Sequence, residues 1–270
     1  MFLLDDTSQF KLVHRPSVTP QIGDLLFVYQ ENKIALTSQH RLPVVNQEIS
    51  SLNQAYCFGY MHEQQCLLLD NDILNIDILK NYQFIEARRS HQFLEKEYFT
   101  AVGIGNHVHH FRNTHRFCGQ CGALTLDKMD EQALICSSCT RVMYPKISPC
   151  AIVLITRGEE ILLARSPHFL PNVMSLLAGF VGIGETVEQT VVREVKEEVS
   201  IEIGNIQYIC SQPWPFPDAL MLGYTAKWVS GEIKIDNHEI EQAAWFHKDN
   251  LPLLPNKMSI ARYLIDRFLE

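Results

Sequence analysis

Residues 179–201 read GFVGIGETVEQTVVREVKEEVSI and carry the most informative pattern of the chain. A glycine-rich turn is followed by a segment with a helical repeat. Glu194, Glu197 and Glu198 stand at positions i, i+3 and i+4, so a helix places all three on one face. Two carboxylates about 4 Å apart repel by roughly 4 kcal/mol at an effective dielectric constant near 20. Divalent cations relieve such repulsion, and hard oxygen ligands suit Mg²⁺ or Mn²⁺.

The opposite side of this segment is apolar. Val187, Val191, Val195 and Val199 recur every four residues and can pack on a sheet. The segment therefore predicts one helix that anchors itself by one face and presents carboxylates on the other. The alternative is an ordinary solvated acidic face, which is what most glutamate clusters are.

The spacing resembles the Nudix box, G-x5-E-x7-R-E-U-x-E-E-x-G-U, in which U is a bulky aliphatic residue. The matching positions are Gly179, Glu185, Arg193, Glu194, Val195, Glu197, Glu198 and Ile201. So many fixed positions make the solvated face a poor explanation. Ser200 replaces the last glycine, near a helix C-terminus where positive φ is common. Either the serine costs about 1 kcal/mol there, or the helix ends differently. Ser200 is not a metal ligand, so its presence leaves the chemistry intact.

Length and composition set broad limits. The chain has 270 residues, 46% of them hydrophobic, which suits two domains or one domain and a module. The formal net charge of −8 gives no global signature of nucleic-acid binding. A local run of histidine and arginine precedes the first CxxC pair: His107, His109, His110, Arg112, His115 and Arg116. It could form a local basic path, but we expect the exposed side of a helix with neutral histidines. Met1–Pro20 has no signal-peptide pattern and no apolar run approaches 18 residues, which predicts a cytoplasmic protein without a membrane span.

Four of the eight cysteines form two CxxC pairs with 14 residues between them. The pairs are Cys118/Cys121 and Cys136/Cys139. Four thiolates at this spacing predict a closed, tetrahedral, structural Zn²⁺ site with no open position for catalysis. The alternatives are two redox CxxC pairs or unrelated free thiols. The separate thiols, expected to be small core residues, are Cys57, Cys66, Cys150 and Cys210.

Element patterns change along the chain. Short strands are expected at 24–29, 33–36 and 65–69, and a helix at 95–115 that Gly103 and Gly105 weaken. After the cysteine module, strands are expected at 149–156, 160–164, 206–210 and 220–229. Helices are expected at 186–199 and 259–269. The predicted domains are 1–115, a zinc ribbon at 116–145 and a catalytic domain at 146–270.

The stretch SQPWPFPDA at 211–219 is a second distinctive motif. Three prolines stiffen it, and Trp214 and Phe216 can present ring faces to a purine or nicotinamide. By physical argument alone, a loop packed on the core explains this segment as well as a stacking surface for a ring does. The stretch resembles the SQPWPFPxS array of NADH pyrophosphatases of the NudC type, with Ala219 in place of the last serine. The resemblance covers about 116–270 and is weaker before that.

This resemblance implies an α+β protein with a β-rich N-terminal domain, a four-cysteine zinc ribbon and a C-terminal Nudix α/β/α sandwich with a mixed sheet. It implies a homodimeric enzyme that hydrolyses the pyrophosphate of NAD(H) to NMN(H) and AMP and acts on NAD-capped RNA. The implied cofactors are structural zinc and catalytic Mg²⁺ or Mn²⁺.

The resemblance also assigns residues. The implied catalytic residues are Glu185, Arg193, Glu194, Glu197 and Glu198, with Arg193 orienting the glutamates and Glu185 paired to it. The implied ligands of Mg²⁺ or Mn²⁺ are Glu194, Glu198, Glu239 and the carbonyl of Ala178. The implied substrate contacts are Gln212, Pro213, Trp214, Pro215, Phe216, Pro217, Asp218, Ala219, Tyr144, Glu131 and Ala261.

Two other functions fit the sequence less well. A Nudix hydrolase of another nucleoside diphosphate derivative, such as ADP-ribose, would not need the array at 211–219. A nucleotide- or RNA-binding regulator with an inactive Nudix fold would be expected to have lost glutamates of the box, and all are present.

Overall fold

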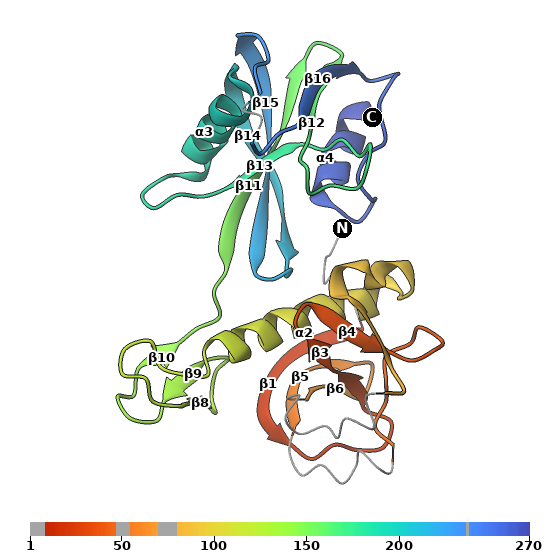
Figure 1. The fold of residues 1–270 in the computed structure, drawn as a ribbon, viewed down its shortest axis with the longest axis vertical. Helices are drawn as coiled ribbons and strands as arrows, with labels where there is room; N and C mark the ends of the chain where they lie inside the picture. The colour runs from red at the N-terminus through yellow and green to blue at the C-terminus, as the bar shows by residue number, and fades with distance from the viewer. Residues whose placement is uncertain (1–8, 47–54, 70–79, 236–237) are drawn as a thin grey trace. The chain divides into compact units, whose positions relative to one another are not determined.

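The computed structural model describes residues 9–46, 55–69, 80–235 and 238–270, which fall into two compact units (Figure 1). The N-terminal unit contains the described residues up to Lys146 together with Pro215–Asp218. The C-terminal unit contains Ile147–Trp214 and Ala219–Glu270. The two units are taken in turn below.

A mixed sheet forms the centre of the C-terminal unit. Its strands are β11 (Ser148–Arg157), β12 (Glu160–Arg165), β13 (Leu177–Phe180), β14 (Glu202–Trp214), β15 (Ala219–Ser230) and β16 (Gln242–His247). The strand order is β14-β15-β11-β12-β16, and β13 pairs with β11. The β11–β15 pair is parallel, whereas the other pairs are antiparallel. A tight turn joins β11 and β12, with Gly158 at φ 61°.

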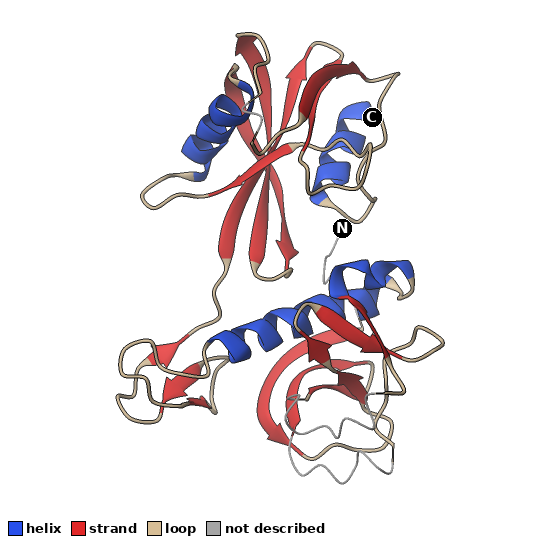
Figure 2. Ribbon diagram, in the orientation of Figure 1, coloured by secondary structure: helices blue, strands red, loops and turns tan. Residues whose placement is uncertain are grey.

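Two helices cover the two faces of this sheet (Figure 2). Alternate side chains of β11 point to opposite faces. Val153 packs in a buried cluster with Val195 of α3 (Val187–Val199). Ile152 packs in a second cluster with Leu264 of α4 (Ile260–Leu269). The predicted α/β/α sandwich with a mixed sheet is therefore confirmed.

Strand β14 is longer than the sequence predicts. The expected strand ends at Cys210, because three prolines follow closely. In the structure the pairing with β15 continues to Trp214, which stands opposite Ala219, and the turn is confined to Pro215–Asp218. Proline is tolerated here because β14 is the edge strand of the sheet, where a missing N–H leaves no partner unsatisfied.

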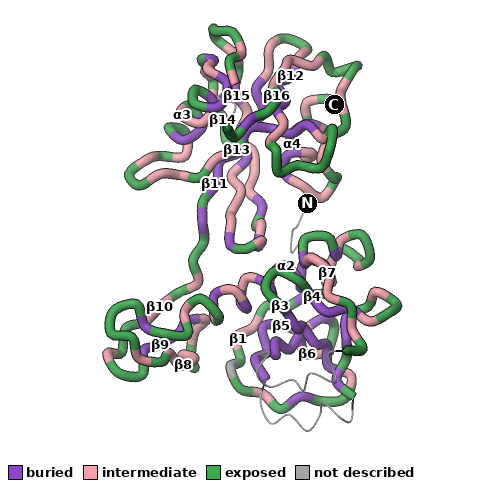
Figure 3. The backbone as a smooth tube through the Cα atoms, in the orientation of Figure 1, coloured by how far each residue is buried: buried purple, intermediate pink, exposed green. Residues whose placement is uncertain are grey.

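The N-terminal unit is rich in β-structure, as predicted. One sheet contains β1 (Phe10–Val18), β5 (Ala55–Met61), β6 (Gln64–Leu68) and β2 (Leu25–Phe27), in that order. A second sheet contains β3 (Tyr29–Gln30), β4 (Lys33–Leu36) and β7 (Gln83–Glu86). A 3₁₀ segment, η2 (Ala87–Gln92), follows β7. In Figure 3 the buried segments of this unit gather in the strands, where Phe27, Phe58 and Leu67 are fully buried.

The long helix α2 (Lys96–Thr114) packs on these strands. Sequence patterns favour this helix only weakly, because glycine is a poor helix former. The structure explains Gly105: a Cβ atom there would lie 2.6 Å from the hydroxyl of Tyr29 and 3.0 Å from the ring of Phe58. The same hydroxyl donates a 2.6 Å hydrogen bond to the carbonyl oxygen of Val102. The missing side chain therefore lets strand and helix approach closely.

Three short strands follow α2, and the cysteine pairs lie in the turns beside them: Cys118 and Cys121 precede the first strand, Cys136 ends the second and Cys139 follows it. The strands are β8 (Thr125–Asp127), β9 (Leu134–Cys136) and β10 (Val142–Met143), arranged β10-β9-β8. This small sheet completes the predicted α+β architecture. Among the residues that the structure describes, no helix is both long and apolar enough to cross a membrane.

Candidate active site

Both ends of α3 are fixed by local interactions. Thr186 caps the first turn: its hydroxyl accepts from the backbone N–H of Gln189 at 3.2 Å, and the Gln189 amide oxygen accepts from the N–H of Thr186 at 2.8 Å. At the other end Ser200 adopts the left-handed conformation, with φ 63°. The sequence predicts positive φ at this position, and the helix ends there although serine has replaced glycine.

The apolar face of α3 anchors the helix on the sheet. Val191, Val195 and Val199 are each at most 1% exposed and belong to one buried cluster. The predicted valine stripe is therefore confirmed. Its burial orients the other side of α3, which carries Arg193 and the glutamates.

Arg193 is the centre of the acidic group. Its Nε and Nη2 donate to the two carboxylate oxygens of Glu185 at 2.6 and 2.9 Å. Its Nη1 donates to Glu194 at 2.8 Å and to Glu197 at 2.9 Å. Nη2 also donates to the carbonyl oxygen of Phe180 at 3.1 Å. Charge-assisted, bidentate bonds of this kind fix geometry strongly. The predicted pairing of Arg193 with Glu185 is present, and one guanidinium group connects three glutamates.

Glu185 ties the glycine-rich turn to the helix. Besides Arg193, its Oε2 accepts from the N–H of Gly182 and from the hydroxyl of Thr190, both at 2.9 Å. The guanidinium of Arg193, followed by the Gly182 N–H and the Thr190 hydroxyl, lowers the pKa of Glu185 to about 2. In turn the glutamates, Glu185 first, raise the pKa of Arg193. Glu185 is therefore ionised at any working pH and acts as a fixed anchor.

Glu194 and Glu198 are the more buried carboxylates of the box. Glu198 is 5% exposed, and the side chain of Glu194 is 13% exposed. Burial raises the pKa of Glu194; Arg193 opposes this, and the charges of Glu197 and Glu239 add to it. Burial, then the charges of Glu194 and Glu198, raises the pKa of the Cys150 thiol in β11 to about 12. Negative charge is thus concentrated and partly desolvated beside β11, which favours binding of a cation.

Gly179 has no side chain and so leaves space for the carboxylate of Glu194. A Cβ atom at Gly179 would lie 1.9 Å from Cδ of Glu194 and 2.1 Å from its Oε1. The carboxylate therefore occupies the space that any side chain at 179 would fill. Ala178, the predicted carbonyl ligand, precedes it in β13 and is exposed. The carboxylate and carbonyl oxygens, and the space that Gly179 leaves for Glu194, fit a hard divalent cation.

The box glutamates do not converge into one tight cluster. Within the described ranges, the cysteine quartet alone brings three or more Cys, His, Asp or Glu donor atoms within 4.8 Å of one another. Like charges separate, and Arg193 engages Glu194 and Glu197. Glu239 follows residues 236–237, which lie outside the described ranges, and its charge acts on Glu194.

Gln212 is enclosed in the C-terminal unit. Its side chain is fully buried, its amide nitrogen donates to the carbonyl of Met258 at 2.8 Å, and its amide oxygen accepts from the N–H of Ile260 at 2.7 Å. The neighbouring Ala261 is 4% exposed in α4. Gln212, in β14, thus fixes the start of α4, where the second predicted substrate contact, Ala261, is buried.

The turn Pro215–Asp218 makes its contacts within the N-terminal unit. Asn106 of α2 donates to the carbonyl of Pro215 at 2.8 Å, and the rings of Phe99 and Phe216 stack with centroids 6.0 Å apart. Phe216 also packs against the buried cluster of that unit. The sequence left open whether this segment packs on the core or presents rings to a ligand. Phe216 packs on the core, whereas Trp214 in β14 is partly exposed. Pro213 and Pro217 are exposed and Ala219 begins β15.

Tyr144 and Glu131 lie together in the N-terminal unit. The Tyr144 hydroxyl donates to Oε1 of Glu131 at 3.1 Å, and Lys128 lies 2.9 Å from the same oxygen. Tyr144 is 58% exposed. The structure thus brings together two residues that the sequence could only place separately.

The four cysteines fit one zinc ion. The Sγ atoms of Cys118 and Cys139 are 3.7 Å apart, and those of Cys121 and Cys136 are 3.4 Å apart. Thiolates bound to zinc at about 2.3 Å stand about 3.8 Å from one another in a tetrahedron. The N–H groups of Cys139 and Ser138 point at Sγ of Cys136 and lower its pKa to about 6. This thiol is ready to act as a thiolate ligand.

Sequence reasoning missed the hydroxyl of Thr190, the N–H of Gly182 and the carbonyl of Phe180. Helical spacing carries a signal for Thr190, which stands three residues before Arg193 and four before Glu194. The two backbone groups carry no signal in the sequence, because any residue supplies them.

Comparison with known proteins identifies two modules. Residues 146–268 match the NUDIX domain family, and residues 113–144 match the NADH pyrophosphatase zinc ribbon domain. The NAD-capped RNA hydrolase NudC of Stutzerimonas stutzeri is 50% identical over 67% of this chain and 66% of its own length. NudC of Pseudomonas aeruginosa is 52% identical over 63% of this chain and 62% of its own length. The matched region thus spans just under two thirds of the length of these curated relatives. A NUDIX hydrolase structure from Nitrosomonas europaea aligns with 57% of this chain and 90% of its own, at 20% identity and a TM-score of 0.49.

Proposed function

We propose that this protein hydrolyses the pyrophosphate bond of NAD(H), because residues 146–268 match the NUDIX domain family and a zinc ribbon of the NADH pyrophosphatase type precedes them. The products are NMN(H) and AMP. We extend the proposal to NAD-capped RNA, the substrate named for the relatives. The observation that carries the proposal is the Arg193 network, which holds Glu185, Glu194 and Glu197 in a defined arrangement.

The residues assigned to hold Mg²⁺ or Mn²⁺ are Glu194, Glu198, Glu239 and the carbonyl of Ala178. The donor chemistry and the space that Gly179 leaves for Glu194 support this assignment. When bound, the cation supplies charge neutralisation at the pyrophosphate and lowers the barrier to nucleophilic attack.

The side chains of the box have different roles in the hydrolysis step. A water oxygen attacks one phosphorus, and the bond from that phosphorus to the bridging oxygen breaks, so that the second phosphate leaves with the bonding electrons. We assign Glu198, the most buried glutamate of the box, to receive the proton of the attacking water. Arg193 and Glu185 hold the carboxylates in place, and the exposed Glu197 adds negative charge beside them.

Substrate contacts are assigned to 212–219, Tyr144, Glu131 and Ala261. The partly exposed ring of Trp214 is the group that we assign to stack on a base. Gln212 acts through the backbone it holds, because both ends of its amide are engaged. A homodimer, the domain boundaries and a cytoplasmic location remain predictions.

A substrate panel tests the proposal. We expect kcat/KM for NADH, NAD⁺ and a short NAD-capped RNA to exceed that for ADP-ribose in the presence of Mg²⁺ or Mn²⁺. The partly exposed ring of Trp214 is the physical reason, because ADP-ribose lacks the nicotinamide ring on which it would stack. A clear preference for ADP-ribose would instead establish the alternative hydrolase.

Gly179→Ala should impair turnover without unfolding the protein. The new Cβ atom would overlap the Glu194 carboxylate, so Glu194 or β13 must shift. A displacement of about 1 Å at a reacting group can cost roughly 100-fold in rate, and we expect a loss of kcat of that order. Steady-state kinetics and circular dichroism would measure both effects. Gly119→Ala is the control, because nothing lies within 4 Å of the corresponding position. A Gly179→Ala enzyme with wild-type kcat would contradict this role for Glu194.

A further inference from the structure

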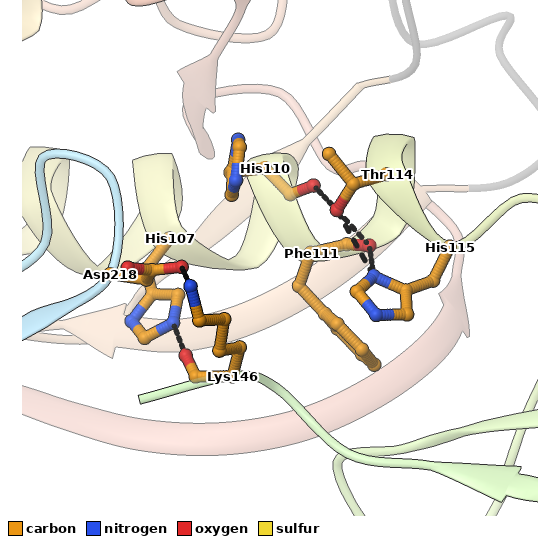
Figure 4. Close-up of a pocket in the computed structure, with 7 residues that line it drawn as sticks. All are labelled: His107, His110, Phe111, Thr114, His115, Lys146 and Asp218. Carbon is orange, nitrogen blue, oxygen red and sulfur yellow. Dashed lines mark hydrogen bonds and ion pairs between the residues drawn. The ribbon is translucent and has the colours of Figure 1, made fainter. Parts of the chain in front are cut away.

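A pocket of about 210 Å³ lies along α2 within the N-terminal unit (Figure 4). Three histidines and a lysine contribute to its lining: His107, His110, His115 and Lys146. The remaining polar groups are Thr114 and the carboxylate of Asp218. The pocket thus gathers one ammonium group and three imidazoles that can each take up a proton.

Helical spacing and the chain after β10 assemble the pocket. His107, His110 and Thr114 follow one another at intervals of three and four residues and share one side of α2. His107 bonds through Nε2 to the carbonyl oxygen of Lys146 at 2.8 Å, which fixes the chain next to the helix. Nζ of Lys146 lies 3.8 Å from Oδ2 of Asp218, and Lys146 keeps a side-chain exposure of 70%.

The charge of the pocket depends on its histidines. Lys146 and Asp218 compensate one another when the histidines are neutral. Burial lowers the pKa of His110; Asp218 opposes this, and His107, His115 and Lys146 add to it. These five are the charged or titratable groups of the pocket, and each histidine that takes up a proton makes it more positive. An anion placed among them would relieve their mutual repulsion.

We infer that this pocket binds a phosphate group of the RNA backbone when the protein acts on capped RNA. The inference rests on the proposed function, which supplies a polyanionic substrate. Asp218 connects the pocket with the proposed function, because it lines the pocket and also belongs to the array at 211–219 that is assigned to the substrate. Non-specific contact between cationic side chains and phosphates is the main source of affinity for nucleic acid. Free phosphate shares the same chemistry, and the experiment separates the two sources.

The test measures the affinity for RNA apart from catalysis. A fluorescent, 5′-monophosphorylated RNA of about twelve nucleotides would be titrated with the full-length protein at several salt concentrations. For Lys146→Glu we expect about tenfold weaker binding. The log–log salt slope should become shallower by about 0.7 for each phosphate of the single strand that the variant no longer neutralises. Lys33→Glu, at an exposed position of β4, changes the net charge by the same amount; it is the matched control and should bind RNA like the wild type.

A second variant examines the histidines. Wild-type binding should strengthen as the pH falls from about 7.5 to about 5, because histidine ordinarily takes up a proton near pH 6.5 and burial lowers the pKa of His110 below that value. His110→Gln should flatten that dependence. RNA affinity, salt slope and pH response that are unchanged in both variants would overturn the inference. Inorganic phosphate that displaces RNA at concentrations equal to the RNA phosphate would assign the pocket to free phosphate and also overturn it.

Hydrolysis of NADH by the same variants separates this inference from the proposed function. We expect Lys146→Glu to retain wild-type kcat for NADH while losing affinity for RNA. Weakened RNA binding together with absent NADH turnover in the wild type would leave the pocket in place and refute the proposed function.

Discussion

Glu198→Gln is expected to lower kcat for NADH by about 10³-fold, within the range typical of a lost proton acceptor. The amide keeps the shape of the side chain but carries no charge and accepts no proton at neutral pH. Glu198 is 5% exposed and lies in a group of like charges, so its neutralisation should not unfold the protein. Steady-state kinetics and thermal unfolding of the same preparation would measure both effects.

A control on the same helix makes this result specific. Glu188 is exposed, and its Oε1 accepts a 3.2 Å hydrogen bond from the hydroxyl of Tyr224. Glu188→Gln changes the charge of α3 by the same amount and should leave kcat near the wild-type value. Equal kcat values for the two variants would show that Glu198 has no special part in the chemistry.

Cys136→Ser is expected to abolish zinc binding and to unfold the ribbon. Small zinc modules gain about 10 kcal/mol or more of folding free energy from the metal, which is more than such a short sheet can replace. The Cys136 thiol accepts from two backbone N–H groups, and a serine hydroxyl is a poor substitute ligand. Zinc content would fall from about one ion per chain to near zero, and amide hydrogens in 113–144 would exchange rapidly.

Cys210→Ser serves as the control for the loss of a thiol. Cys210 lies in β14, outside the ribbon, and is partly exposed. We expect this variant to keep its zinc and the slow exchange of 113–144. Stoichiometric zinc in Cys136→Ser would instead mean that the quartet is not the zinc site.

The sequence predicts the C-terminal unit well because local patterns and tertiary contacts agree there. The valine stripe identifies the buried face of α3, and the capping residues Thr186 and Ser200 mark its ends. The two CxxC pairs predict the quartet, because only two residues separate the thiols of each pair. In these places the information lies within a few residues of sequence.

Other features depend on contacts between distant residues. The prolines at 213–217 suggest a separate loop, but the edge position of β14 lets the strand continue to Trp214. Gly105 disfavours a helix locally, whereas its approach to Tyr29 requires the glycine. The contacts of Gln212 with the start of α4 join residues 46 and 48 positions apart. The periodicity and motif spacing of the sequence do not predict contacts between residues so far apart.

The most direct measurement is product analysis by mass spectrometry after incubation with NADH in water enriched in ¹⁸O, with Mg²⁺ or Mn²⁺ present. Hydrolysis of the pyrophosphate predicts NMNH and AMP, one of them carrying a single ¹⁸O atom, and about 10³-fold slower formation of both with Glu198→Gln. Nicotinamide and ADP-ribose as products, or intact NADH in the presence of folded, zinc-loaded protein, would contradict the account.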